Sequence, residues 1–115
     1  MEGGVALPKG REKGMNIAKN IGLIEWLKSE LLSFVSDLFT LLTNGVRGTQ
    51  EAIIDCLANI VLVSYLLGRR LGIHYGVIDK RIGEKIRLGI LDEHDVESEY
   101  GYLSMLSEYF KQTRE

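Results

Sequence analysis

Residues 50–73, QEAIIDCLANIVLVSYLLGRRLGI, form the most apolar stretch of the chain and decide its fold. Apolar side chains occupy most positions in its middle, so a helix over residues 50–70 is apolar nearly all round. Such a helix must be covered on most sides, and a chain of 115 residues has few other elements to cover it. The sequence therefore predicts a helical core that a second copy completes, as a homodimer or higher oligomer.

The spacing of apolar residues predicts three further helices, and no segment keeps the alternation of a strand. Residues 16–43 place an apolar side chain every three or four positions, residues 75–88 carry one apolar stripe, and a last helix follows from residue 92 or 95. Gly72 interrupts the pattern, and Gly89 is expected to end the third helix. We expect an all-α four-helix bundle, with a disordered tail at residues 1–15 and one domain at residues 16–115.

Composition restricts the class of protein. The formal net charge is −2 and the pI about 5.7, so no overall basic field attracts nucleic acid or anionic membranes. A membrane span needs roughly 20 clean apolar residues, and Asp55 and Asn59 interrupt the run. The lone Cys56 suits a reducing compartment. We expect a cytoplasmic protein without membrane contact, and His74 and His94 lack the neighbouring nitrogen ligand that zinc would need.

Polar residues inside the two most apolar helices are the candidates for chemistry. Glu51, Asp55 and Asn59 recur every four residues and so share one face, and Glu30 and Asp37 share a face of the first helix. Two facing helices that carry carboxylates can hold Mg²⁺ through oxygen ligands. The alternative interpretation, two solvated helix faces, explains Asp37 and Glu51 well. It explains Asp55 and Asn59 less well, because both interrupt the apolar run.

These segments resemble the MazG-like family of all-α nucleoside triphosphate pyrophosphohydrolases. That family carries an E-E-x-x-E motif on one helix and an E-x-x-D motif on the next, and their acidic groups hold Mg²⁺ against a nucleoside triphosphate. The corresponding segments here are Ser29-Glu30-Leu31-Leu32-Ser33 and Ala52-Ile53-Ile54-Asp55. The helix end at residues 66–73, LLGRRLGI, is also similar to the family, and the likeness covers roughly residues 21–91.

The resemblance implies Mg²⁺-assisted attack of water on a nucleoside triphosphate, which releases pyrophosphate and a monophosphate. It assigns Glu30 and Asp55 as metal ligands, with Glu51 and Asp37 close enough along their helices to contribute. Basic residues that follow the second motif would meet the phosphates, and these resemble Lys85 and Arg81. The family has glutamates at the positions of Ser29, Ser33 and Ala52 in this chain. We therefore expect nucleotide binding with weakened or lost hydrolysis.

Two functions of other classes remain open. Residues 67–73 (LGRRLGI), followed by Val77, Ile78 and Arg81, are similar to a helix-turn-helix, with Lys80, Arg81 and Lys85 on the second helix. The long apolar helix before the turn and the acidic net charge argue against DNA binding. A non-catalytic dimeric scaffold is the other alternative, because this chain lacks several of the acidic residues of the family motifs.

Overall fold

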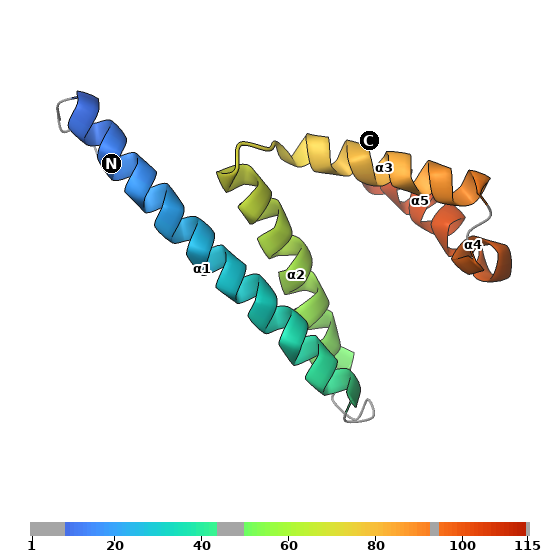
Figure 1. Cartoon of the computed structure of the whole chain (residues 1–115). Helices are drawn as coiled ribbons and strands as arrows, with labels where there is room; N and C mark the ends of the chain where they lie inside the picture. The colour runs from blue at the N-terminus through green and yellow to red at the C-terminus, as the bar shows by residue number, and fades with distance from the viewer. Residues whose placement is uncertain (1–8, 44–49, 93–94, 115) are drawn as a thin grey trace. The chain divides into compact units, whose positions relative to one another are not determined.

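The computed structural model describes residues 9–43, 50–92 and 95–114, and these ranges contain five α-helices and no strand (Figure 1). The all-α prediction is confirmed. The helices are α1 (Lys9–Thr43), α2 (Gln50–Arg70), α3 (Tyr75–Leu91), α4 (Asp95–Tyr100) and α5 (Tyr102–Arg114). The chain divides into two compact units, Met1–Ile73 and His74–Glu115, and each is described by itself.

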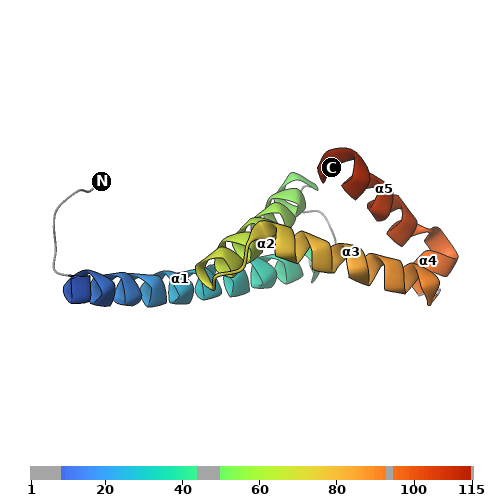
Figure 2. The same ribbon diagram turned by 90° about the horizontal axis from the view of Figure 1, so that it is seen from above.

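In the first unit, α1 and α2 form an antiparallel hairpin (Figure 1), and Figure 2 shows α2 crossing α1 at an angle. The covered residues recur in steps of three and four on both helices, which is the spacing of a coiled-coil seam. The most deeply buried are Leu27, Cys56 and Val63, at 2%, 8% and 6% exposure. The seam comprises Asn20, Ile24, Leu27, Leu31, Phe34, Leu38 and Leu41 of α1, and Ile53, Cys56, Ile60, Val63 and Leu67 of α2.

A hydrogen bond between α1 and α2 marks how far the two helices overlap. The side-chain nitrogen of Asn20 donates to the carbonyl oxygen of Arg70 at 3.4 Å. Residues 9–19 of α1 therefore extend beyond the last turn of α2. The helix begins at Lys9, earlier than the residue 16 expected from periodicity. Periodicity did not predict this start, because residues 9–15, KGREKGM, carry charges instead of an apolar repeat. Of the expected tail, residues 1–8 lie outside the described residues.

The segment after α2 forms a complete helix stop. Gly72 has a φ of +86°, a left-handed conformation that glycine adopts without strain. Its backbone nitrogen donates to the carbonyl of Arg69 at 3.0 Å, and the nitrogen of Ile73 donates to that of Gly68 at 2.8 Å. These two bonds define a Schellman motif, which satisfies carbonyls at the end of the helix. The helix thus ends where the sequence predicts an interruption, and the left-handed Gly72 with these two bonds is the physical reason.

In the second unit, α3 packs against α5, with Ile86 only 5% exposed. The ring nitrogen Nδ1 of His74 caps the start of α3 by accepting a hydrogen bond from the Gly76 backbone at 2.9 Å. The expectation that Gly89 ends this helix is wrong, since α3 continues to Leu91. A Cβ at Gly89 would lie 2.6 Å from Cδ1 of Leu103, so this glycine permits a close approach of α5 and does not act as a stop.

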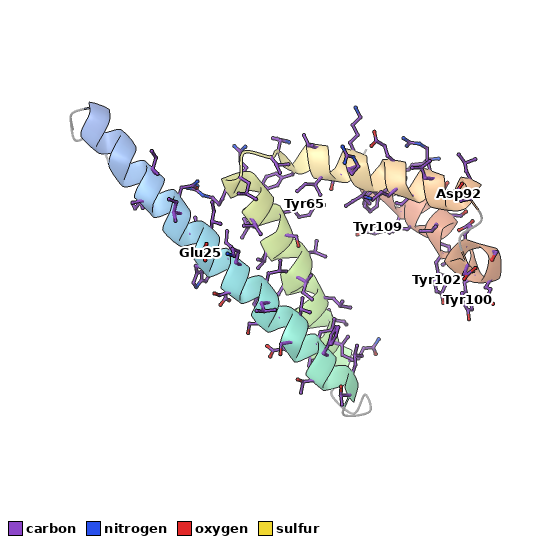
Figure 3. All side chains as sticks on the ribbon, in the orientation of Figure 1. Glu25, Tyr65, Asp92, Tyr100, Tyr102 and Tyr109 are labelled. Carbon is purple, nitrogen blue, oxygen red and sulfur yellow. The ribbon has the colours of Figure 1, made fainter. Side chains whose placement is uncertain are left out.

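The single last helix expected from the sequence is divided at Gly101, whose φ is +66°. On either side of the break, the rings of Tyr100 and Tyr102 stack with centroids 5.0 Å apart (Figure 3). Glu97 of α4 accepts a hydrogen bond from the backbone nitrogen of Ser104 at 3.0 Å, and another from its hydroxyl. The chain therefore turns a defined corner between α4 and α5.

The hairpin leaves much of its apolar surface exposed in a single chain. Over the 18-residue window that makes α2 apolar enough to cross a membrane by length and composition, only 11% of residues are buried. The core helix of a soluble protein passes the same test, and α2 carries Asp55 and Asn59. The large exposed apolar residues are Ile17, Ile21, Leu23, Trp26, Leu32, Phe39 and Leu42 of α1, and Ile54, Leu57, Val61, Leu62 and Leu66 of α2. Self-association thus remains a prediction.

Candidate functional site

Two of the polar residues singled out in the sequence lie level with one another in the hairpin. In an antiparallel pair, each step forward along α1 corresponds to a step backward along α2. The bond between Asn20 and Arg70 therefore places Glu30 level with Asn59 and Ile60. Both Glu30 and Asn59 are partly buried beside the apolar seam. The hairpin thus brings a carboxyl and an amide to the same height on its two helices.

Within the described residues, these two groups lack a side-chain partner. Among the described residues, neither Glu30 nor Asn59 forms a side-chain hydrogen bond or an ion pair. Polar groups that are withdrawn from water are normally satisfied by protein, water or ligand. By contrast, Glu25, one turn earlier on α1, is exposed and pairs with Lys28 at 3.2 Å. The level of Glu30 and Asn59 therefore offers hydrogen-bonding groups to water or to a ligand.

The other predicted acidic ligands lie on more exposed parts of the helices. An ideal helix turns about 100° per residue, so the stripe of Glu51, Asp55 and Asn59 drifts by about 40° at each step. Measured from Cys56 in the seam, Glu51 is roughly 140° away, Asp55 roughly 100° and Asn59 roughly 60°. This drift explains why Glu51 and Asp55 are exposed and Asn59 is partly buried. Asp37 on α1 is exposed as well.

The predicted acidic ligands are spread along the hairpin of one chain. Asp55 is about 7.5 Å along the helix axis from the level of Glu30, by the rise of an α-helix. No group of three or more His, Cys, Asp or Glu side chains in the described part of the chain lies close enough to hold a metal ion. The assignment of Glu30, Asp55, Glu51 and Asp37 as Mg²⁺ ligands therefore stays a prediction, and we derive no catalytic step through a metal.

The predicted phosphate-binding residues belong to the second unit, whereas the acidic residues belong to the first. Arg81 and Lys85 lie one helical turn apart on α3, and both are exposed. The guanidinium of Arg81 pairs with Glu84 at 3.2 Å, which occupies part of its donor capacity. Their contact with phosphate remains a prediction.

A basic cleft between α3 and α5 was missed by sequence reasoning. Its volume is about 610 Å³, and its basic lining residues are Lys80, Arg87 and Lys111. The sequence carried a usable signal, because Gly76, Lys80, Gly83 and Arg87 recur in steps of three and four and so share one face of α3. Nothing in the sequence shows which face of α3 is covered by α5, so Lys80 and Arg87 could not be assigned to one cleft.

A comparison with protein-family models matches residues 17–103 to the MazG-like family. This match spans most of the chain, and the protein therefore belongs to the MazG-like family. The resemblance drawn from the motif segments of α1 and α2 is confirmed. Family membership supports a relationship to nucleotide pyrophosphohydrolases. No curated protein and no solved structure matches the chain.

Proposed function

We propose that this chain is a nucleotide-binding protein of the MazG-like family, in which the α1–α2 hairpin binds a nucleoside triphosphate and pyrophosphate release is weak or lost. The supporting observation is that Glu30 and Asn59 are partly buried and level with each other on the two helices, with no side-chain hydrogen bond or ion pair to another described residue. A carboxylate and an amide together offer acceptors and donors, as recognition of a sugar or base requires.

The acidic residues support the second half of the proposal. Ser29, Ser33 and Ala52 carry no carboxylate where the resemblance places glutamates. The remaining acids of one chain do not gather in threes within the described residues. Without a dense cluster of carboxylates, a chain cannot concentrate the cation charge that phosphoryl chemistry uses to offset developing negative charge. Binding without efficient turnover is the chemistry that this arrangement favours.

A second copy of the chain is part of the proposal. The middle of α2 exposes large apolar side chains, and exposed apolar surface of this kind marks an association site; the residues are Ile54, Leu57, Val61, Leu62 and Leu66. A copy packed on this surface would cover the helix that the sequence predicts to be buried. It would also withdraw Glu30 and Asn59 further from water, which strengthens hydrogen bonds to a ligand.

Thermal unfolding of the purified full chain with each of the four common nucleoside triphosphates, with and without Mg²⁺, tests the proposal. A ligand that binds only the native state stabilises it by about 2.7 kcal/mol at one hundred times its Kd. We expect one or more triphosphates to raise the melting temperature of the parent. Glu30→Gln should reduce this rise, because it removes the negative charge and one acceptor while preserving side-chain shape.

The matched control is Glu25→Gln, which makes the same chemical change on the exposed side of α1. It should retain the nucleotide effect of the parent. Pyrophosphate release, measured in the same samples, separates binding from turnover. If no triphosphate changes the melting temperature, or if Glu25→Gln and Glu30→Gln reduce the effect equally, the proposed hairpin site is wrong.

A further inference from the structure

The cleft between α3 and α5 combines positive charge with an apolar floor. It lies wholly in the second unit and encloses about 610 Å³, a volume typical of small-molecule sites. Among its described lining residues, Lys80, Arg87 and Lys111 are cationic and Asp79 alone is acidic. The lining therefore carries an excess of positive charge, although the chain as a whole is acidic.

The cations of this cleft are only weakly compensated. Neither Lys80 nor Arg87 forms an ion pair with a carboxylate in the described part of the chain. Lys111 approaches Glu108 at 3.8 Å, a distance that leaves most of its donor capacity unused. Lys80 and Arg87, which have no carboxylate partner among the described residues, share the cleft with Lys111, and three such cations attract a compact anion.

Glycines on α3 make room for such an anion beside the arginine. A Cβ built at Gly83 would lie 3.9 Å from Nη1 of Arg87, so the guanidinium lies back over the glycine and along the cleft wall. Gly76 lines the same cleft in the first turn of α3, where the helix dipole is positive. Small residues beside a fork of guanidinium donors suit the close, two-point contact that a phosphate makes.

The other side of the cleft is suited to a flat apolar group. Ile86 is buried at its floor, Phe110 is partly buried on α5, and the hydroxyl of Ser107 lies in the lining. An aromatic ring offers a face or an edge to another planar group, and such contacts add to the area that is buried. The cleft therefore pairs an anion-binding wall with a surface for a ring.

We infer that the α3–α5 cleft binds a small phosphate monoester that carries a planar aromatic group, with Arg87, Lys80 and Lys111 holding the phosphate. The site uses residues of the second unit alone, and it does not depend on the nucleotide site proposed for the hairpin. A nucleoside monophosphate is one member of this chemical class. Arg81 and Lys85 are absent from the lining, so the cleft is separate from the phosphate-binding residues expected from the sequence.

Isothermal titration of the full chain with phenyl phosphate and with methyl phosphate, both in EDTA, tests the inference. Phenyl phosphate should bind more tightly, because only this probe can contact Phe110. Arg87→Gln should weaken its binding about 10-fold or more, since a hydrogen bond to a charged group contributes about 1.5–3 kcal/mol. The control Arg69→Gln/Arg70→Gln removes two exposed positive charges outside the cleft, and it should bind phenyl phosphate within about 2-fold of the parent.

A second variant protects the test against loss of structure. Lys80→Gln/Lys111→Gln leaves Arg87, Ile86 and Phe110 in place. It should also weaken the binding of phenyl phosphate, while the far-ultraviolet circular dichroism spectrum stays unchanged. Equal loss of affinity in the Arg69→Gln/Arg70→Gln control would show general attraction to charge and overturn the inference. No heat of binding from either probe would overturn it too, as would equal affinity for the two probes. Tighter, salt-sensitive binding to duplex DNA than to phenyl phosphate would replace the small molecule with a nucleic acid.

Discussion

Glu97 of α4 accepts hydrogen bonds from both the hydroxyl and the backbone nitrogen of Ser104, and so fixes the start of α5 to the preceding helix. The side-chain bond from Ser104 is the main cause that lowers the pKa of Glu97 from its ordinary value, and backbone bonds from Ser104 and Leu103 add to it. The ionised carboxylate is thus the form that the folded α4–α5 corner prefers.

This preference predicts a pH dependence of the second unit. Because the folded pKa is lower than the unfolded one, the stabilisation is present above the unfolded pKa and is lost as pH falls through the folded pKa. Glu97→Gln should therefore lower the melting temperature near neutral pH and differ less from the parent as the solution becomes acidic. Melting curves from about pH 7 down to about pH 3 measure this. A constant difference at every pH would contradict the assigned role of the carboxylate.

Two glycine-to-alanine changes should have opposite effects. Gly101 has a φ of +66°, where an alanine side chain is strained, so Gly101→Ala should destabilise the protein by roughly 1–2 kcal/mol. At Gly22, within α1, a Cβ would meet no atom within 4 Å, so Gly22→Ala should stabilise it by about 0.5–1 kcal/mol. Urea unfolding of the two variants measures both values. Equal effects would mean that backbone conformation at Gly101 is not the limiting factor.

Self-association through the exposed face of α2 predicts a specific sensitivity at Leu62. Light scattering should give at least twice the monomer mass of 12.9 kDa for the parent. Leu62, which is 53% exposed in one chain, would lie within the interface. Leu62→Glu should lower the measured mass or precipitate the protein, whereas Leu62→Met, which keeps the position apolar, should preserve the mass. A soluble parent monomer at micromolar concentration would contradict self-association. A parent protein that stays in solution only with detergent would favour a membrane as the partner of this face instead.

Restoring the acidic positions should create the cation site that one chain lacks. In Ser33→Glu/Ala52→Glu, two further carboxylates join Glu30 and Asp55 on the facing helices, and without metal their mutual repulsion should lower stability. Mg²⁺ or Mn²⁺ should then raise the melting temperature of this variant more than that of the parent. Adding Asp55→Asn should reduce the gain. A variant that responds to metal no more than the parent would show that the hairpin cannot bring these positions together.

The helix-turn-helix interpretation predicts duplex binding that falls steeply with salt, because phosphate contacts release counterions. The exposed cations of α3 are its basis, but Arg81 already pairs with Glu84 and the net charge is negative. We expect negligible binding to a mixed-sequence duplex at about 150 mM salt in a fluorescence anisotropy titration. Binding that selects one sequence over another would revive this interpretation.

The α1–α2 hairpin was predictable, because most of the residues that its helices bury against each other are apolar and recur three and four positions apart. Helix ends that depend on a left-handed residue were harder to foresee. Gly72, Gly89 and Gly101 look alike in sequence, yet the first stops a helix, the second lies within one, and the third separates two. Only the close approach of Leu103 shows why Gly89 is glycine.

The candidate sites were predictable to different extents. The order of Glu30 and Asp55 along their helices followed from motif spacing, but the exposure of Asp55 depends on how the polar stripe of α2 drifts relative to the seam. The basic cleft could not be located without α5, because Lys80 and Arg87 become part of a concave surface only when Phe110 and Lys111 lie opposite.

Burial of Cys56 gives the protein a native reporter of hairpin opening. This thiol is 8% exposed between α1 and α2, and it is the only cysteine in the chain. A thiol reagent can modify it only when the helices part, so the labelling rate measures the frequency of local opening. If a second copy clamps the hairpin, that rate should fall as protein concentration rises. The wild-type sequence can thus be followed without a dye or a mutation.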